Sequence, residues 1–599
     1  MKKRHSVLTA VVAAGVVSVA VRAEETTLNP VIITTTRTAQ TADDNLAAVT
    51  VLTREDIERS QAKTAAELLA GTPGMNVSVN GGYGKTTSVF LRGTNSDHVI
   101  VLVDGTRVGS ATLGGYSWEF LPIEQIERIE IVRGPRSSLY GADAIGGVIQ
   151  IFTRKGQEGF HGGATVGYGT FESREYTANA SGAGDGFHYS VGASRYQTDG
   201  INARNVAVAK EPDSDGYRNN GFNTRMGYDF GNGTTLDAHL LHSQGHSEFD
   251  GNPNQTDFIQ NTLGTELKFA PTTNWVTKLQ GGHGRDENDS FKDGVFLSNF
   301  YTRRRTLSWQ NDVTLAPKQL ATLGVDYQDE TVSSTTAYNA SERRNMGYFV
   351  QHQAGFGAHD VTLNLREDNN QAFGTHGTGG IAWGYAIEGE SLRLVTSYGT
   401  AFKAPTFNQV FYPGIGNPDL KPETSESYEI GLRGKAEQTT WSITAYQTNI
   451  ENLIIFQPPT FQAFNINKAR IVGLENEIAF KTDNNRLAFN LTYLDPRDVE
   501  TDKLLPRRPQ RDFKADEEYT LRRWHLGGTW LMQSYRFDNP QNTTRVGGYG
   551  VVDMHARYDM GKYWFLKARA GNIFDKQYET VATYNSPGRN YFVTLGYQQ

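Results

Sequence analysis

The stretch Val552–Met560, VDMHARYDM, changes between apolar and charged residues at nearly every position. Successive side chains of a β-strand point to opposite faces, so this stretch has one face of Val, Met, Ala and Tyr and another of Asp, His and Arg. Such a strand suits a transmembrane β-barrel, in which one face meets lipid and the other lines a wet lumen. Soluble sandwiches and propellers give similar alternation, so this stretch alone leaves those architectures open.

The same alternation begins near residue 156 and persists to the end of the chain. Leu487–Tyr493 follows it, as does the last segment, Tyr591–Tyr597. The apolar faces end in aromatic residues, as expected at the borders of a bilayer. Residues 156–599 are long enough for about 22 strands, with roughly 20 residues for each strand and its connection. We therefore predict an all-β transmembrane barrel of about 22 antiparallel strands.

The composition supports a barrel and excludes other classes. The 599 residues include 63 Gly, 28 Tyr, 30 Phe, 8 Trp and no Cys, and the mean hydropathy is −0.50. After the first 25 residues no apolar run approaches the roughly 18–20 residues of a membrane-spanning helix, which excludes a helical membrane protein. The many aromatic residues argue against disorder, and a chain without cysteine cannot be a disulfide scaffold. The absence of Cys fits an oxidising compartment.

The N-terminus has the form of an export signal. A basic start, Lys2–His5, precedes a nearly continuous apolar run from Val7 to Val21, with small residues before the expected cleavage after Ala23. Removing residues 1–23 takes away four basic and no acidic residues, so the formal net charge falls from −7 to −11. This acidic balance argues against nucleic acid as a partner, for which a basic surface is expected. We predict that the mature protein is exported.

Residues 50–155 have the pattern of a compact α+β domain. Thr53 and Thr64 each stand three residues before an acidic residue, as in a helix capping box. Short apolar segments that follow, such as Val99–Val103 and Gly147–Phe152, predict a buried sheet. The expected organisation is a leader at 1–23, an N-terminal segment at 24–49, this domain at 50–155 and the barrel at 156–599.

Four longer segments carry a resemblance to a known family. They are VRGPRSSLYGADAIGGV at 132–148, YGTAFKAP at 398–405, GNPDLKPET at 416–424 and GNIFDKQYET at 571–580. In these segments the chain resembles the TonB-dependent outer-membrane receptors of Gram-negative bacteria. The resemblance implies that the domain at 50–155 is a plug inside the barrel, that the barrel lies in outer-membrane lipid, and that the periplasmic protein TonB supplies energy.

The resemblance also assigns the short segment after the leader. It is similar to the TonB box, which pairs with TonB by strand addition. Its β-branched residues favour an extended chain, and its proline is compatible with an edge strand. The alternative is an unstructured tail. The predicted TonB box comprises Asn29, Pro30, Val31, Ile32, Ile33, Thr34 and Thr35.

Within the family, the chain is most similar to the cobalamin receptors at Asn80–Gly84 and at Leu91–Asn95 with His98, both in the plug, and at Tyr578–Val581 near the C-terminus. The resemblance implies cobalamin contacts from plug loops and from barrel loops. Ordinary turn chemistry and solvated loops are the alternatives for these positions. The predicted substrate contacts are Thr86, Ser88, Asn95, Thr112, Leu113, Gly114, Arg507, Arg508 and Tyr535.

Two acidic segments form a candidate metal site. Glu211-Pro-Asp-Ser-Asp215 precedes Phe249-Asp250 by about 40 residues of chain, and clustered oxygen ligands suit Ca²⁺. Solvated acidic loops are the alternative. The resemblance implies two Ca²⁺ ions that order the extracellular loops. The ligands it implies are Glu211, Asp213, Asp215, Asp250, Asp257 and the Phe249 carbonyl, with Asn202 at a further position and Asp199 nearby.

The leading functional hypothesis is TonB-dependent transport of cobalamin into the periplasm. A ferric siderophore or another metal chelate is the alternative substrate, and a β-rich surface binding or adhesion protein is the alternative class. A surface receptor of this kind can also be used by phages or bacteriocins. The sequence contains no nucleophile–base arrangement that argues for catalysis. Plug residues Arg92, Glu130, Arg133 and Arg136 are predicted to form salt bridges with the barrel wall.

Overall fold

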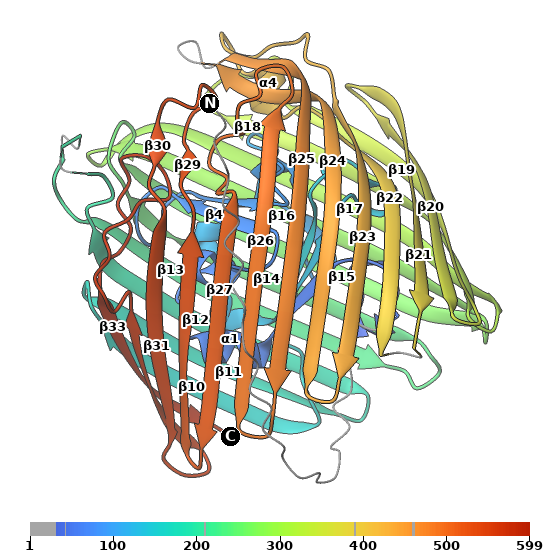
Figure 1. The fold of residues 1–599 in the computed structure, drawn as a ribbon, viewed down its shortest axis with the longest axis horizontal. Coiled ribbons are helices and arrows are strands. Elements are labelled where there is room, and N and C mark those ends of the chain that lie inside the picture. The colour runs from blue at the N-terminus through green and yellow to red at the C-terminus, as the bar shows by residue number, and fades with distance from the viewer. Residues whose placement is uncertain (1–30, 42–43, 206, 209–210, 389–390, 458–461) are drawn as a thin grey trace, which may run out of the picture.

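The computed structural model describes residues 31–599, apart from 42–43, 206, 209–210, 389–390 and 458–461. A closed β-barrel surrounds an N-terminal domain that fills its interior (Figure 1). The predicted leader, residues 1–23, lies outside the described residues and stays a prediction. Within the described part of the chain, no helix combines the length and apolar character needed to cross a membrane.

The barrel has 22 strands, and neighbours along the ring pair antiparallel. The last strand pairs with the first, Val166 opposite Leu595, so no sheet edge is left open in the ring. This confirms the predicted fold class. The strands are β10 (Gly159–Gly169), β11 (Ser173–Gly184), β12 (Phe187–Ile201), β13 (Asp215–Asp229), β14 (Thr235–Glu248), β15 (Gln255–Thr272), β16 (Trp275–Lys292), β17 (Val295–Ala316), β18 (Gln319–Ser334), β19 (Glu342–Phe356), β20 (His359–Asn370), β21 (Gly374–Ala386), β22 (Leu392–Lys403), β23 (Glu423–Ala436), β24 (Thr439–Gln457), β25 (Gln462–Lys481), β26 (Asn485–Asp498), β27 (Arg511–Leu521), β28 (Trp524–Gln533), β31 (Tyr549–Asp559), β32 (Trp564–Gly571) and β33 (Asn590–Gln598).

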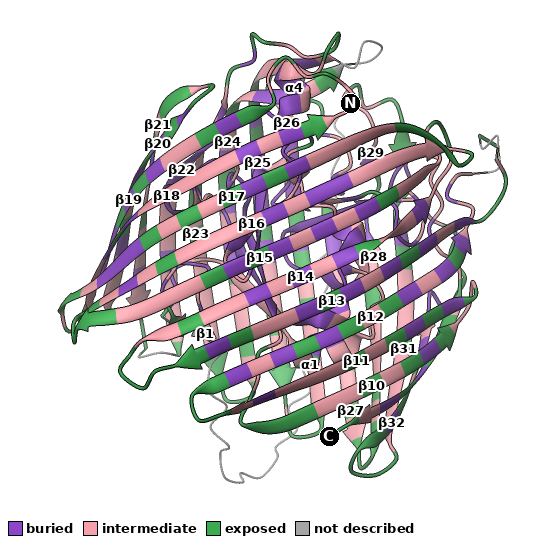
Figure 2. Cartoon of the chain, turned by 180° about the vertical axis from the view of Figure 1, so that it is seen from behind, coloured by how far each residue is buried: buried purple, intermediate pink, exposed green. Residues whose placement is uncertain are grey.

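Exposed and covered residues alternate along these strands, which produces the banding in Figure 2. On β31, Met554 is 53% exposed on the outer surface, whereas its neighbour Asp553 accepts bonds from Arg569 and Asn572. Trp564 and Tyr428 are about half exposed as well, as expected for aromatic residues at a lipid interface. The outer face therefore meets lipid, and the inner face holds the polar residues that contact the plug.

The plug contains a five-stranded sheet in the order β3-β8-β9-β6-β7, in which only β6 and β9 run parallel. Its strands are β3 (Val49–Thr53), β8 (Ile126–Arg133), β9 (Gly147–Thr153), β6 (Val99–Val103) and β7 (Thr106–Val108). Three smaller sheets are the pairs β1 (Val31–Ile32) with β2 (Gln40–Thr41), β4 (Met75–Val79) with β5 (Thr87–Leu91), and, in a barrel loop, β29 (Arg536–Phe537) with β30 (Arg545–Val546).

Short helices connect the plug strands. They are α1 (Arg54–Ser60), α2 (Ala65–Leu69) and α3 (Ser137–Tyr140), with α4 (Phe407–Phe411) in a barrel loop and 3-10 turns at Ser96–His98, Trp118–Phe120 and Ile123–Gln125. Thr53 forms the predicted capping box with Asp56 at the start of α1. The Thr64 side chain accepts a bond from the Glu67 N–H at the start of α2, while the Glu67 carboxylate accepts from the Lys63 N–H.

Candidate functional site

The predicted TonB box lies against the plug and is held by one buried carboxylate. Asn29 and Pro30 lie outside the described residues. Ile32 is fully buried in β1, and the chain then turns at Thr34–Thr36 instead of staying extended. Glu130 explains the turn, because its Oε2 accepts bonds from the N–H groups of Ile33 (3.0 Å) and Thr34 (2.9 Å) and from the Thr34 hydroxyl (2.6 Å). The segment must therefore be released before it can pair with another chain.

The residues after this segment attach it to the barrel. Arg37 forms a two-point ion pair with Asp326 of β18, at 3.1 and 2.9 Å, and its guanidinium lies over the rings of Tyr140 and Phe349. Arg366 of β20 donates to the same Asp326 at 2.6 Å. Two cations thus share one half-buried carboxylate where the residues after β1 meet the wall.

The first predicted substrate loop lies at the top of the plug. Thr86 is exposed and Ser88 is half-buried opposite Ser78 in the β4–β5 pair. The loop packs closely on the wall at Gly84, where φ is +71° and a Cβ atom would lie 2.0 Å from the Tyr217 ring. Glycine is therefore required to bring this loop against β13.

Asn95 and Arg508, both predicted substrate contacts, contact each other. The Arg508 guanidinium donates to Asn95 Oδ1 at 2.6 Å and to the carbonyls of Gly93 and Thr94 at 3.0 and 3.1 Å. Arg508 is buried and lies over the Phe90 ring. In this state the arginine joins a barrel loop to the plug rather than facing the barrel mouth.

The other predicted substrate contacts are divided between the plug and the barrel loops. Leu113 is 68% exposed at the plug surface, next to Gly114 with φ +84°, whereas Thr112 is buried and hydrogen-bonded to Ser110. Arg507 is paired with Asp538 at 2.8 Å, and Tyr535 lies under the Arg545 guanidinium. The structure does not bring all these residues to one surface.

The candidate metal residues separate into a cluster and outliers. Asp250 has both carboxylate oxygens covered and without a hydrogen-bond partner. Burial, together with the charges of Asp213 and Glu211, raises the pKa of Asp250. Asp215 is buried beside them and accepts a bond from the Ala203 N–H. A covered carboxylate with acidic neighbours is the arrangement that a cation would stabilise.

The remaining candidates have other partners. Asp257 lies on the outer face of β15 and pairs with His246 at 2.7 Å. Glu211 forms an ion pair with Lys292, which lowers its pKa. The Asn202 side chain accepts from the Arg204 N–H, Asp199 is exposed, and the Phe249 N–H donates to Asn254. Among the described residues, no group of three or more His, Cys, Asp or Glu side chains is already placed to hold a metal.

Lys85 is a feature of the site that sequence reasoning missed. It is 3% exposed, and its ammonium donates to the carbonyls of Tyr83 (2.8 Å), Asp215 (3.2 Å) and Gly216 (3.2 Å). Burial lowers its pKa to about 8. The lysine thus links the first substrate loop to the start of β13, beside the acidic cluster. The signal available in the sequence was a lysine in a glycine-rich loop, together with an acidic loop later in the chain that could pair with it.

Buried ion pairs attach the plug to a second part of the wall. Arg92 pairs with Glu475 at 2.9 Å and with Glu429, and Arg133 pairs with Glu475 and Glu477. The prediction was correct for these two arginines. It was wrong for Glu130, which binds the Thr34 segment and Arg128, because that carboxylate points within the plug. Arg136 donates to the adjacent Pro135 carbonyl instead.

Two family models match the two parts of this architecture. The model described as "TonB-dependent Receptor Plug Domain" matches residues 41–148. The model described as "TonB dependent receptor-like, beta-barrel" matches residues 159–573.

Two named relatives match nearly the whole chain. Proteins named "Vitamin B12 transporter BtuB" from Photobacterium profundum and Vibrio vulnificus are 32% identical over 589 residues and 33% identical over 603 residues. In both cases 96% of each chain is covered.

Solved structures share the fold at lower identity. The siderophore receptor PirA from Acinetobacter baumannii has a TM-score of 0.80 at 19% identity, covering 92% of this chain and 98% of that one. A mutant of the ferric enterobactin receptor PfeA from Pseudomonas aeruginosa, in complex with enterobactin, has a TM-score of 0.80 at 20% identity, covering 93% and 100%. Together, the plugged barrel, the two family models and these relatives show that the chain belongs to the TonB-dependent receptors of the Gram-negative outer membrane.

Proposed function

We propose that this receptor takes up cobalamin at the cell surface and delivers it to the periplasm when TonB pulls on the plug. The observation that carries the proposal is the match to proteins named vitamin B12 transporters, at 32–33% identity over 96% of the chain. The siderophore receptors share only the fold, since their identity is 19–20%. A ferric chelate is therefore the alternative substrate that an experiment must test.

The chemistry of the plug surface suits a large neutral ligand with amide side chains. Thr86 and Asn95 offer hydroxyl and amide groups, and the exposed Leu113 offers an apolar contact. Hydrogen bonds fix the orientation of such a ligand, while apolar contact contributes most of the binding energy. A ligand that takes over the Asn95 amide would compete with Arg508 for it.

Calcium belongs to the proposal as a loop-ordering ion. Asp213, Asp215 and Asp250 would hold it, with the Phe249 carbonyl as an additional oxygen ligand. The covered, unpartnered oxygens of Asp250 support this assignment. Asp257 fits less well because it faces outward and pairs with His246. A cation here would offset the repulsion between these carboxylates and the entropy cost of ordering the loops.

The energy-coupling step starts at the segment Val31–Thr35. Membership of the family implies coupling to TonB, and we propose that TonB takes up this segment by strand addition. Glu130 and Asp326 resist its release through the bonds to Thr34 and Arg37. Freeing the segment requires both carboxylates to exchange buried partners for water.

Isothermal titration of the purified receptor tests the substrate. Cyanocobalamin should bind, and binding should weaken when calcium is removed. Asp213→Ala with Asp215→Ala should weaken it as well, whereas Asp185→Ala with Asp483→Ala, exposed acids in turns at the opposite end of the barrel, should not. A receptor that does not bind cyanocobalamin and binds ferric enterobactin tightly would overturn the substrate assignment.

A further inference from the structure

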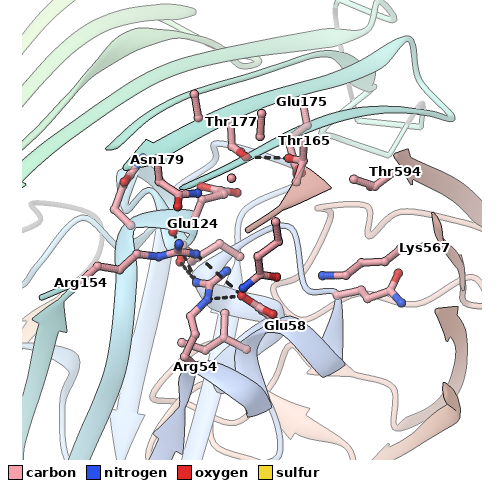
Figure 3. Close-up of a pocket in the computed structure, with 18 of the residues that line it drawn as sticks. Arg54, Glu58, Glu124, Arg154, Thr165, Glu175, Thr177, Asn179, Lys567 and Thr594 are labelled. Carbon is pink, nitrogen blue, oxygen red and sulfur yellow. Dashed lines mark hydrogen bonds and ion pairs between the residues drawn. The ribbon is translucent and has the colours of Figure 1, made fainter. Parts of the chain in front are cut away.

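Two cavities lie between the plug and one side of the barrel wall. The larger, of about 190 Å³, is bounded by α2, by the β4–β5 pair and by wall residues such as Thr529 and Val551. The smaller, of about 110 Å³, is bounded by α1 and by wall residues such as Thr177 and Lys567 (Figure 3). Because β11 and β27, β28, β31 and β32 lie on one arc of the ring, both cavities belong to the same side of the barrel.

Only a short connector separates the two cavities. The connector, defined as residues 60–64, runs from Ser60 at the end of α1 to the start of α2, and Ala62 lines both spaces. Lys63 closes the gap to the wall through an ion pair of 2.8 Å with Glu175, and the Gln61 side chain donates to the Ala556 carbonyl at 3.2 Å. The partition is thus a loop held by two side chains.

Each cavity lies toward a different end of the receptor. The larger one reaches Gly81–Gly84, which ends two residues before the exposed Thr86 of the first predicted substrate loop. The smaller one reaches Gly163 and Gln598, close to the opposite end of the barrel where β10 begins and β33 ends. The two cavities therefore lie between the ligand side and the periplasmic side, with residues 60–64 between them.

The plug can open here without loss of its central sheet. None of the residues that bound these two cavities belongs to the five strands of that sheet. Elsewhere along the wall, the spaces beside Arg304 and beside Glu330 are about 20 Å³ each, which is room for roughly one water molecule. The plug therefore fits the wall less tightly at the two large cavities than at these two spaces.

The lining suits a polar solute without net charge. Thr64, Thr529 and Thr580, together with Tyr549 and Tyr578, line the larger cavity. Arg569 crosses it between Glu67 and Asp553, at 2.8 Å from each, so its charge is compensated. Sites that enclose a small molecule hold roughly 300–1,000 Å³, so the connector must move before such a solute passes.

We propose that the transported solute passes along the cavity wall, defined as β27, β28, β31–β33 and β10–β12, and that connector 60–64 is the partition that moves. The inference deepens the proposed function and rests on it for the identity of the solute. The absence of cysteine from the chain makes single-cysteine variants direct reporters of this path.

The test places one cysteine at a time on each wall. Thr529→Cys and Thr177→Cys lie on the cavity wall, and Thr322→Cys and Thr378→Cys are matched changes of inward threonines on β18 and β21. In energised cells given cyanocobalamin, a membrane-impermeant bulky maleimide should label the first pair severalfold faster when TonB is present. Labelled Thr529→Cys should lose uptake and keep cyanocobalamin binding. Faster labelling on β18 and β21, or normal uptake by the labelled variant, would overturn the proposal.

A second measurement needs no ligand and separates this inference from the proposed function. Arg569→Ala removes the cation that crosses the larger cavity, and Arg304→Ala removes a matched inward arginine that holds the plug at the Val108 carbonyl. Cells that produce Arg569→Ala should become sensitive to vancomycin, whereas cells with Arg304→Ala should stay at the wild-type level. If wild-type receptor does not bind cyanocobalamin, the substrate assignment fails and this comparison still decides the path. Greater sensitivity with Arg304→Ala, or none with either variant, would contradict the inference.

Discussion

The anchored wall, β17–β20, and the cavity wall hold the same plug in different ways. On the anchored wall, Glu330 binds Arg304 and Arg343, and Arg304 and Arg366 donate to the plug carbonyls of Val108 and Leu139. The cavity wall meets the plug across two open spaces. Since β19 lies half-way round the ring from β32, the two regions face each other. Both walls have the same lipid-facing alternation, so inward side chains alone decide where the plug is fixed.

The largest effect is expected from the centre of the anchored wall. Glu330→Ala leaves two buried arginines without their shared carboxylate. Removing one partner of a buried ion pair costs about 3–5 kcal/mol, so the plug should unfold at clearly lower urea concentration. Intrinsic fluorescence of the purified receptor measures this transition. Glu342→Ala, an exposed acid on β19, is the control and should behave as wild type.

Losing an ion-pair partner on the cavity wall should lower the stability of the plug less than the same loss on the anchored wall. Arg569→Ala frees Glu67 and Asp553, but water in the adjoining cavity can solvate both carboxylates. The expected cost is about 1–3 kcal/mol, the range for losing a hydrogen-bond partner of a buried group. The same urea transition measures it. A loss larger than that of Glu330→Ala would remove the distinction between the two walls.

The segment Val31–Thr35, next to the anchored wall, offers a finer test. Thr34→Val removes the hydroxyl bonds to Glu130 and to Gln150 and keeps the shape of the side chain. Hydrogen bonds to charged groups contribute about 1.5–3 kcal/mol, so the segment should detach more often, and a spin label at residue 32 should become more mobile. Thr35→Val is the matched control, because the buried Thr35 hydroxyl has no partner. Equal mobility in both variants would show that Glu130 does not hold the segment.

A pH-dependent effect is expected from a carboxyl that lines the larger cavity. Burial raises the pKa of Glu119 from its ordinary value of 4.5 to about 8. Between these values the folded plug binds more protons than the unfolded chain, so stability should fall as pH rises from about 4.5 to about 8. Urea unfolding at several pH values measures this slope. Glu119→Gln should flatten it, whereas Glu55→Gln, exposed on α1, should leave it unchanged.

The sequence predicted the barrel well because alternation is a local property. The strand around Met554 and the cap at Thr53 depend on neighbours within a few residues. The alternation along β15 could also have shown that Asp257 faces outward. Asp257 lies on the same face of this strand as Leu263, which is 50% exposed.

Contacts between distant segments could not be predicted in the same way. Glu130 binds a residue 96 positions away, and Arg508 binds carbonyls more than 400 positions away. Both side chains were expected to contact other groups. The partner of a charged residue depends on which distant segment the fold places beside it. The family resemblance supplied residue identities for the metal and substrate sites. It did not predict the contacts that Lys85 and Arg508 make with the Tyr83 carbonyl and with Asn95.

Uptake of radiolabelled cyanocobalamin tests the central claim most directly. The receptor would be produced in cells that lack their own cobalamin receptor, with and without TonB. Accumulation above the surface-bound amount is expected only when TonB is present, because release of the Thr34 segment needs an external force. Accumulation independent of TonB, or none in either strain from a receptor that is folded in the outer membrane, would contradict the account.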